Sequence, residues 1–402
     1  MKPNEGLTMK GSVLIEYTGE EKEVTVPEGV THIAACAFSD CKRLEAVTLP
    51  DSLTEIGLCA FEGCSRLREI LLPDGVSKIG FDAFKNCSSL QTVSLPDGIN
   101  EIDHEAFRGC AALSYNEYEG ASYLGNEKNP FVALCFVKNK NIQKATVHPD
   151  TRLLLDGAFE GCERIAEASL PDGIKWIGSN AFSGCTALTR LSLPKGVKQI
   201  QSSAFSFCDS LRSLSLPEGV TQVGDYAFSC GGLTNITLPD SLESVGKGAF
   251  PHSTTVRYTV YEGGLYLGNE ENPYVAFAAL QNEKTDSIRL HEKTRILLDG
   301  AFYQNKSIRR VALPEGLRQI GSDAFRECTA LTEITVPRSV REIGADAFAS
   351  CTSLACVHME TKEAKIESGA FMGCAALRSI SIPASSVEDY TIDGCASLTD
   401  VT

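Results

Sequence analysis

The sixteen cysteines are the residues of this chain with the most chemistry, since thiolates bind metals, attack electrophiles and pair as disulfides. Metal and redox sites commonly use C-x-x-C pairs, and the sequence contains none. Most of the cysteines instead recur three residues after the phenylalanine of an Ala-Phe pair, at Cys41, Cys64, Cys87, Cys110, Cys162, Cys185, Cys208, Cys328, Cys351 and Cys374. Asn305 takes the same place in another unit. Because asparagine cannot replace a disulfide partner, we predict a structural ladder of reduced thiols that hydrogen-bond the backbone.

Two further cysteines stand at a different place in the same pattern. Cys36 and Cys59 directly precede an Ala-Phe pair in consecutive units, where other units carry a polar residue. Two interpretations stay open for them, a pair of unpaired surface thiols or a disulfide.

Other catalytic groups are not arranged for chemistry. The histidines, His32, His104, His148, His252, His291 and His358, have no metal-binding spacing. The sequence contains neither a G-x-S-x-G elbow nor a P-loop. We therefore expect no enzyme, with no catalytic residue, no metal and no cofactor.

Tyrosine is concentrated in two segments, residues 115–134 and 258–277, which match at thirteen of twenty positions at an offset of 143. Each segment turns at a Gly-Asn pair, which predicts a hairpin or a wide coil. Tyrosine is common on recognition surfaces, so these residues are candidate binding residues, although they could also pack the hairpin on the rest of the chain. They are Tyr115, Tyr118, Tyr123, Tyr258, Tyr261, Tyr266 and Tyr274.

The elements that position these residues follow a 23-residue period, marked by Pro27, Pro50, Pro73 and Pro96. A fixed period of this length indicates a solenoid. In one unit, Leu90 to Leu95 has the pattern of a leucine-rich repeat strand, which Pro96 ends. We predict a β-rich solenoid of the α/β class, a right-handed superhelix with a parallel sheet of one strand per coil and short helical turns on the opposite side. Those turns would begin at N-cap residues before Ala-Phe, namely Asp82, Asn180, Ser203, Asp323 and Asp346.

The 23-residue period is interrupted twice, because Phe107 to Phe159 and Phe250 to Phe302 each span 52 residues. We interpret residues 1–23 as an N-terminal capping segment and 24–402 as one continuous solenoid with insertions at 114–141 and 257–284. The common offset of 143 relates blocks 115–257 and 258–402 as an internal duplication.

The exposed face of the predicted sheet carries a column of serine and threonine residues with arginines beside it. Five arginines are candidate binding residues for an acidic protein or an anionic glycan, although a merely solvated face is the alternative. They are Arg190, Arg212, Arg309, Arg310 and Arg378.

Charge and hydropathy exclude two classes of partner. The net charge of −15 argues against binding to nucleic acid or to anionic lipid. No apolar run approaches 18 residues, so we expect no membrane insertion. The first residues show no apolar signal segment, and the last ones show no anchor motif.

The repeated unit, for example LPDGVSKIGFDAFKNCSSL at residues 72–90, resembles the BspA-like leucine-rich repeats of bacterial surface proteins, whose signature is I-P-x-x-V-x-x-I-G-x-x-A-F-x-x-C-x-x-L. The resemblance covers residues 24–402 and implies a non-catalytic adhesion or protein-binding function at the cell surface or in secreted form. A host or matrix protein would then be the partner. A glycan-binding module and a cytoplasmic interaction scaffold remain alternatives, and we expect a monomer.

Overall fold

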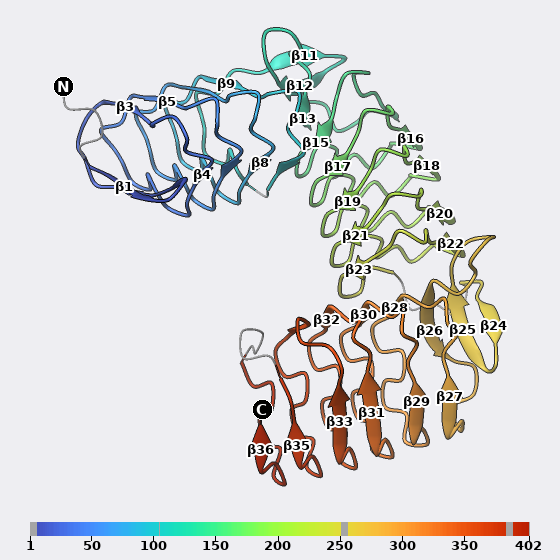
Figure 1. Cartoon of the computed structure of the whole chain (residues 1–402). Helices are drawn as coiled ribbons and strands as arrows, with labels where there is room; N and C mark the ends of the chain where they lie inside the picture. Colours follow the sequence, from blue (N-terminus) through green and yellow to red (C-terminus); the bar gives the residue numbers. More distant parts are fainter. Residues whose placement is uncertain (1–5, 104, 251–255, 383–388, 402) are drawn as a thin grey trace. The chain divides into compact units, whose positions relative to one another are not determined.

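The computed structural model describes residues 6–103, 105–250, 256–382 and 389–401, so His104 and His252 lie outside the described residues. The chain forms two compact units, Met1–Asp209 and Ser210–Thr402. Each unit is a β-solenoid whose short strands stack in register from coil to coil (Figure 1). This confirms the solenoid that the 23-residue period predicts.

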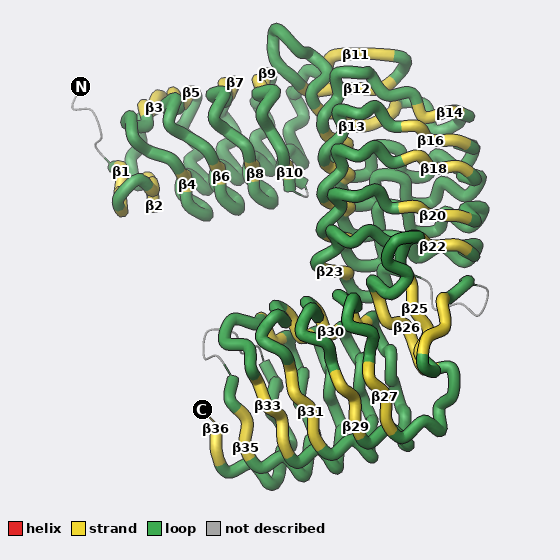
Figure 2. Tube along the Cα trace, turned by 45° about the vertical axis from the view of Figure 1, so that its right-hand side comes forward, coloured by secondary structure: helices red, strands yellow, loops and turns green. Residues whose placement is uncertain are grey.

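Each coil contributes two short strands, one more than the repeat pattern predicts. The first strand is the Leu-x-x-Ile segment, as in the parallel pair Ile70 and Val93. The second strand is the Ile-Gly segment, as in the parallel pair Ile56 and Ile79. Both Ile56 and Ile79 are fully buried. The return segment therefore forms a ladder of its own, and we call the two sets the first-strand and second-strand ladders (Figure 2).

The strands of unit 1 fall into three groups. The first-strand ladder comprises β3 (Glu23–Thr25), β5 (Ala46–Thr48), β7 (Glu69–Leu71), β9 (Thr92–Ser94), β14 (Lys144–Ala145), β16 (Glu167–Ser169) and β18 (Arg190–Ser192). The second-strand ladder comprises β4 (His32–Ile33), β6 (Glu55–Ile56), β8 (Lys78–Ile79), β10 (Glu101–Ile102), β15 (Leu153–Leu154), β17 (Trp176–Ile177) and β19 (Gln199–Ile200). The antiparallel strands are β1 (Leu7–Lys10), β2 (Val13–Tyr17), β11 (Asn116–Tyr118), β12 (Ala121–Leu124) and β13 (Ala133–Val137).

Unit 2 contains the same three groups. The first-strand ladder comprises β20 (Ser213–Ser215), β22 (Asn235–Thr237), β27 (Ser287–Arg289), β29 (Arg310–Ala312), β31 (Glu333–Val336), β33 (Cys356–Met359), β35 (Ser379–Ile380) and β36 (Asp400–Val401). The second-strand ladder comprises β21 (Gln222–Val223), β23 (Ser244–Val245), β28 (Ile296–Leu297), β30 (Gln319–Ile320), β32 (Glu342–Ile343) and β34 (Lys365–Ile366). The antiparallel strands are β24 (Thr259–Tyr261), β25 (Gly264–Leu267) and β26 (Ala276–Leu280).

The expected helical turns are absent from the described residues, which contain no helix. The predicted N-cap residues Asp82, Asn180, Ser203, Asp323 and Asp346 have φ of 55–57°, the left-handed region that Asn, Asp and Gly tolerate best. The backbone N–H groups that follow these positions donate hydrogen bonds to the following coil. For example, the Phe38 N–H donates to the Ala60 carbonyl at 2.7 Å. A backbone that hydrogen-bonds to its neighbouring coil cannot also close an α-helical turn, so the prediction was wrong here.

The phenylalanines of the Ala-Phe pairs form a stacked column inside the coils. The ring centroids of Phe38, Phe61 and Phe84 lie 4.8 and 5.2 Å apart, with nearly parallel planes. Phe302, Phe325 and Phe348 repeat this in unit 2 at 4.8 and 4.9 Å. All of these rings except that of Phe302, which is 2% exposed, are fully buried. One coil cannot bury its own phenylalanine, so stacking supplies most of the core.

The two inserted segments are three-stranded antiparallel hairpins. In the first hairpin β12 pairs with β11 and β13, and β13 then pairs in parallel with β15. In the second hairpin β25 pairs with β24 and β26, and β26 pairs in parallel with β28. The pair β1 and β2 has the same arrangement, since β2 runs parallel to β4. Each hairpin therefore begins a new second-strand ladder, as the first strands of the chain do.

Candidate functional site

The cysteine ladder lies inside the coils, and its thiols donate hydrogen bonds to the backbone. The Cys64 thiol donates to the carbonyl of Phe38, 26 residues earlier, at 3.1 Å. Asn305 fills the same slot and donates to the Glu283 carbonyl at 3.0 Å. Equivalent thiol bonds of 3.0 to 3.4 Å are made by Cys87, Cys110, Cys185, Cys208, Cys328, Cys351, Cys374 and Cys395. All sixteen cysteines belong to the described residues, and all are free thiols there, Cys36 and Cys59 included.

Burial suppresses the reactivity of this ladder. It raises the pKa of Cys110, Cys185, Cys328 and Cys374 to about 12, because a thiolate would lose its hydration inside the coil. The thiolate is the form that binds metals and attacks electrophiles. At these four positions burial therefore disfavours the reactive form of the thiol, and the side chains contribute to packing.

The described ranges contain no cluster of three or more His, Cys, Asp or Glu side chains arranged to hold a metal ion. Within the same ranges, no helix has the length and hydropathy needed to cross a membrane.

The open face of the first-strand ladders is polar and exposed. The serine and threonine column is exposed at Thr48, Ser192, Ser215, Thr335 and Ser381 and half-buried at Ser94 and Thr237. The candidate arginines Arg190, Arg212, Arg309, Arg310 and Arg378 are all exposed. Arg190 pairs with Glu167 on the preceding strand β16 at 2.6 Å, and Arg212 donates to the Gly232 carbonyl at 2.9 Å. Such exposed pairs contribute little to stability, which leaves these side chains available to a partner.

Each hairpin carries a cluster of four aromatic rings. In the first cluster, Phe131 stacks on His148 at 4.0 Å and Tyr118 meets His148 edge-on at 4.8 Å. The second cluster repeats this, since Tyr274 stacks on His291 at 3.8 Å and Tyr261 meets His291 edge-on at 4.9 Å. Tyr123 and Tyr266 complete the two clusters.

The candidate tyrosines differ in how far a partner could reach them. Tyr123 and Tyr266 are fully buried, and their hydroxyl oxygens accept the backbone N–H of His148 and His291 at 3.3 Å. These two rings pack the hairpin on the coil, where no partner can touch them. The other five are half-buried: Tyr115, Tyr118, Tyr258, Tyr261 and Tyr274.

An asparagine at each Gly-Asn turn fastens the hairpin to the preceding coil. The Asn126 amide donates to the Leu95 carbonyl at 2.8 Å, and its side-chain oxygen accepts the backbone N–H of Asn129 at 2.8 Å. Asn269 makes the equivalent bonds to Leu238 at 3.0 Å and Asn272 at 2.8 Å. The Gly-Asn turn therefore sets the position of each hairpin against the first-strand ladder.

In unit 1 the first-strand face and the first hairpin enclose a hollow of about 840 Å³. Leu71, which is 60% exposed, and Tyr115 supply apolar surface. Asp97, Asn126 and Lys128 supply polar groups. A concave surface of mixed polarity is the common form of a binding site.

Leu71 indicates this hollow in the sequence, although the predicted serine and threonine column does not include it. Leu71 pairs with Ser94 in the register of β7 and β9, so a leucine stands where β5, β9, β16 and β18 carry serine or threonine. Leu71 and Tyr115 both line the hollow, and apolar residues gathered at one site, unlike single exposed ones, indicate a contact surface.

The chain matches the family model described as BspA type leucine rich repeat region (6 copies), over residues 14–127, 132–258 and 274–400. No curated protein sequence matches the chain.

Solved structures of leucine-rich repeat proteins resemble the chain. A leucine-rich repeat protein from Bacteroides ovatus is 25% identical over 97% of this chain and 94% of its own, with a TM-score of 0.34. A leucine rich cell surface protein from Faecalibacterium prausnitzii is 20% identical over 100% and 95%, with a TM-score of 0.28. The pneumococcal vaccine antigen PcpA is 16% identical over 86% and 79%, with a TM-score of 0.30.

Proposed function

Because the chain belongs to the BspA-type leucine-rich repeat family, we propose that it is a non-catalytic binding protein that recognises another protein. It would act in adhesion or interaction at a bacterial cell surface, with a host or matrix protein as the partner. Repeat proteins of this shape bind through the exposed surface that their stacked strands create.

The hollow at the first hairpin carries this proposal. Its volume of about 840 Å³ lies within the range of known ligand sites, and it opens beside exposed strands that offer further contact area. Leu71 and Tyr115 would serve as apolar anchors, and the polar groups of Asp97 and Lys128 would orient the partner.

A binding array of extracellular matrix and plasma proteins, probed with the full chain, tests the proposal. Leu71→Asp should weaken a true interaction tenfold or more, because it places a charge in the apolar part of the hollow. Leu58→Asp is the matched control, since Leu58 is a similarly exposed leucine, at 47%, that does not line the hollow.

Three results bear on the proposal. Binding that Leu71→Asp weakens and Leu58→Asp does not would support it. Binding that both variants weaken equally would place the contact elsewhere. Failure to bind any protein on the array would argue against the proposed function.

Glycan binding is the second candidate, and the second aromatic cluster favours it. Tyr261 and His291 line a hollow of about 610 Å³ together with Glu262, Arg289 and Glu292. Half-buried aromatic rings beside charged hydrogen-bonding groups suit a sugar ring. A glycan array with the full chain and with Tyr261→Ala tests this, because a sugar hit that the variant abolishes would favour the glycan reading.

The cell-surface location is part of the proposal and needs its own measurement. We expect surface protease treatment of intact cells of the native bacterium to degrade the protein. Protection of the protein in intact cells, with degradation only after lysis, would favour the cytoplasmic scaffold instead.

A further inference from the structure

A similar pocket occurs twice, each time where a second-strand ladder ends and a hairpin begins. In unit 1 the pocket follows β10 and has a volume of about 370 Å³. In unit 2 it follows β23 and has a volume of about 320 Å³. Residues 143 positions apart line both copies, among them Ala106 and Ala249, Phe107 and Phe250, and Asp156 and Asp299.

The two copies differ in the residues that fill them. Cys135 and Phe136 on β13 line the first pocket, and Ala278 and Ala279 on β26 replace them in the second. The loss of the phenyl ring opens the second pocket toward the hairpin, where Tyr258, Leu265 and Leu267 line it. Tyr115, Ser122 and Leu124, the equivalents of these three residues, do not line the first pocket.

The first copy shows what kind of group fits this position. The Phe136 ring lies 5.1 Å from the Tyr115 ring, edge to face at 77°. Phe136 pairs with Ser122 across β12 and β13, and Ala279 pairs with Leu265 in the same register. Tyr258 therefore lacks the aromatic neighbour that Tyr115 has, and an edge-to-face ring is the arrangement that aromatic pairs prefer.

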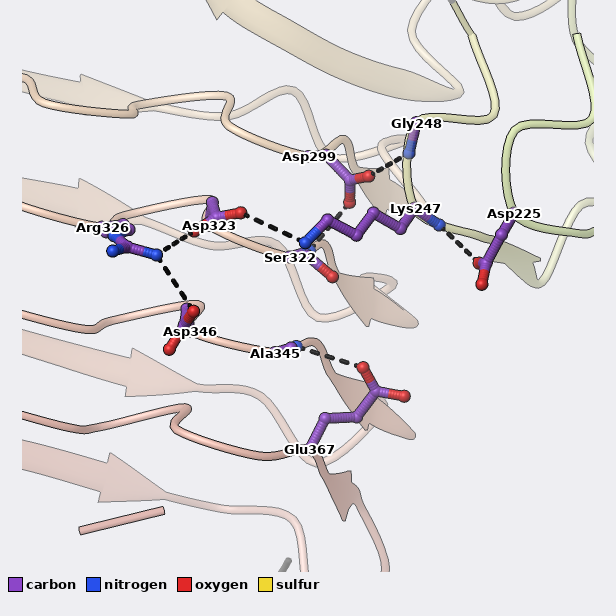
Figure 3. Close-up of polar contacts among 10 residues, drawn as sticks. All are labelled: Asp225, Lys247, Gly248, Asp299, Ser322, Asp323, Arg326, Ala345, Asp346 and Glu367. Carbon is purple, nitrogen blue, oxygen red and sulfur yellow. Dashed lines mark hydrogen bonds and ion pairs between the residues drawn. The ribbon is translucent and has the colours of Figure 1, made fainter. Parts of the chain in front are cut away.

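Electrostatics of the second pocket also favour a neutral apolar group. Asp103 and Glu105 of the first pocket are replaced by Gly246 and Gly248. Asp299, the one carboxylate among the described residues of the wall, accepts the backbone N–H of Gly248 at 2.7 Å and that of Ser322 at 2.8 Å (Figure 3). Both of its oxygens are thus engaged in joining the coils on either side of the hairpin.

The surface beside the second pocket has become apolar as well. In the first hairpin Glu117 accepts a hydrogen bond from Ser122 at 2.9 Å and pairs with Lys138 at 3.0 Å. In the second hairpin Val260 stands where Glu117 does, pairs with Leu265, and is 52% exposed. A ligand that enters the pocket would therefore meet further apolar surface at its mouth.

We propose that the pocket between β23 and the second hairpin binds an aromatic side chain of a protein partner, in the place that the Phe136 ring takes in the first copy. The inference rests on the proposed function, because it names the group that the partner inserts. A cavity of roughly 150 Å³ holds one benzene molecule, so about 320 Å³ admits a ring together with part of its backbone.

The test uses the full chain and three neutral probes, the N-acetyl amides of phenylalanine, tyrosine and leucine, in ligand-observed saturation-transfer NMR. We expect saturation of the aromatic rings and little of the leucine side chain. Ala279→Phe should abolish the transfer, because the new ring fills the pocket. Phe136→Ala, the matched change in the first copy, should leave the transfer at the second pocket intact.

A second variant distinguishes loss of binding in the pocket from misfolding of the protein. Leu265→Ser restores the residue of the first copy and should reduce the ring transfer at least threefold, while circular dichroism reports an unchanged fold. Equal transfer to the leucine and phenylalanine amides would overturn the inference. So would transfer that survives in a folded Ala279→Phe protein.

The experiments can reject the proposed pocket and the proposed function independently of each other. If a protein partner is found and its affinity is unchanged by Ala279→Phe, the inference is overturned and the proposed function stands. If the aromatic amides bind in a way that Ala279→Phe abolishes and no protein partner exists, the preference of the pocket is supported and the proposed function fails.

Discussion

The first hairpin, β11 to β13, and the second, β24 to β26, share the same framework. Both bury a central tyrosine, both stack an aromatic ring on a histidine, and both attach their turn through asparagine. They differ where side chains line the pocket between the second-strand ladder and the hairpin, as at Phe136 and Ala279. Buried positions have a fixed volume and fixed hydrogen bonds to satisfy, so divergence is tolerated mainly where space is open.

We call the two places where a hairpin follows a second-strand ladder the junctions. They also differ in one residue of the ladder that comes after the hairpin. In unit 2 the Gln319 side chain accepts the Val245 N–H at 2.8 Å and donates to the Val245 carbonyl at 2.9 Å. In unit 1 the equivalent residue is Trp176, which is 4% exposed and whose indole N–H has no hydrogen-bond partner among the described residues. The Gln319 amide therefore bonds the backbone of Val245 as a neighbouring strand would, whereas Trp176 contributes apolar packing at the equivalent place in unit 1.

The largest effect should come from truncating these two residues. Trp176→Ala should lower the free energy of unfolding by about 3–5 kcal/mol, because it leaves a large cavity. Gln319→Ala should lower it by about 1–3 kcal/mol, because it leaves two backbone groups unpaired. Urea unfolding followed by circular dichroism measures both. A larger loss for Gln319→Ala would reverse our assignment of how each junction is held.

A smaller and equal effect should follow from removing the shared turn asparagines. Asn126→Ala and Asn269→Ala should each lower the free energy of unfolding by about 1–3 kcal/mol, because each leaves a buried carbonyl and turn N–H groups without their partner. Thermal unfolding of the two variants provides the measurement. Asn126→Asp and Asn269→Asp are controls that keep the acceptor and lose the donor. A loss confined to one hairpin would contradict the shared framework.

A third effect tests the pocket through stability. Ala279→Phe should raise the free energy of unfolding by about 0.5–2 kcal/mol, as cavity filling commonly does. Phe136→Ala should lower it by about 1 kcal/mol, because a ring that is 37% exposed buries only part of its surface. Thermal melts compare the two. Destabilisation by Ala279→Phe would mean that the second pocket does not accept a phenyl group.

The smallest effect concerns Asp103, which Gly246 replaces in the second pocket. Burial, and then the nearby Glu101 carboxylate, raise the pKa of the Asp103 carboxyl. The folded state thus disfavours the charged form, a penalty that exists at pH 7 and disappears as the pH falls below the unfolded value of 3.8. Asp103→Asn should therefore stabilise the protein at pH 7 and not at pH 3, as urea midpoints at the two pH values will show. Destabilisation at pH 7 would contradict this.

Much of the framework was predictable from sequence because it depends on local, repeated patterns. The place shared by Cys64 and Asn305 predicts a small buried side chain that can hydrogen-bond the backbone, and both side chains donate to a carbonyl of an earlier coil. The Gly-Asn turn and flanking tyrosines correctly indicated a hairpin. The helical turn at Asp82 was wrong because Asp favours both N-caps and left-handed turns, and only the pairing with the next coil decides between them.

Residues a few positions apart, or one repeat apart, are enough to specify the coil, its period, the buried column and the location of each hairpin. The pairing of the return segment as a second ladder, and the pocket that Ala279 leaves open at Tyr258, become visible only in the folded chain. A pocket is the space left by side chains that come from distant parts of the chain, here from β23, β26 and β28. The volumes of those side chains meet only after folding, so no local pattern encodes the space between them.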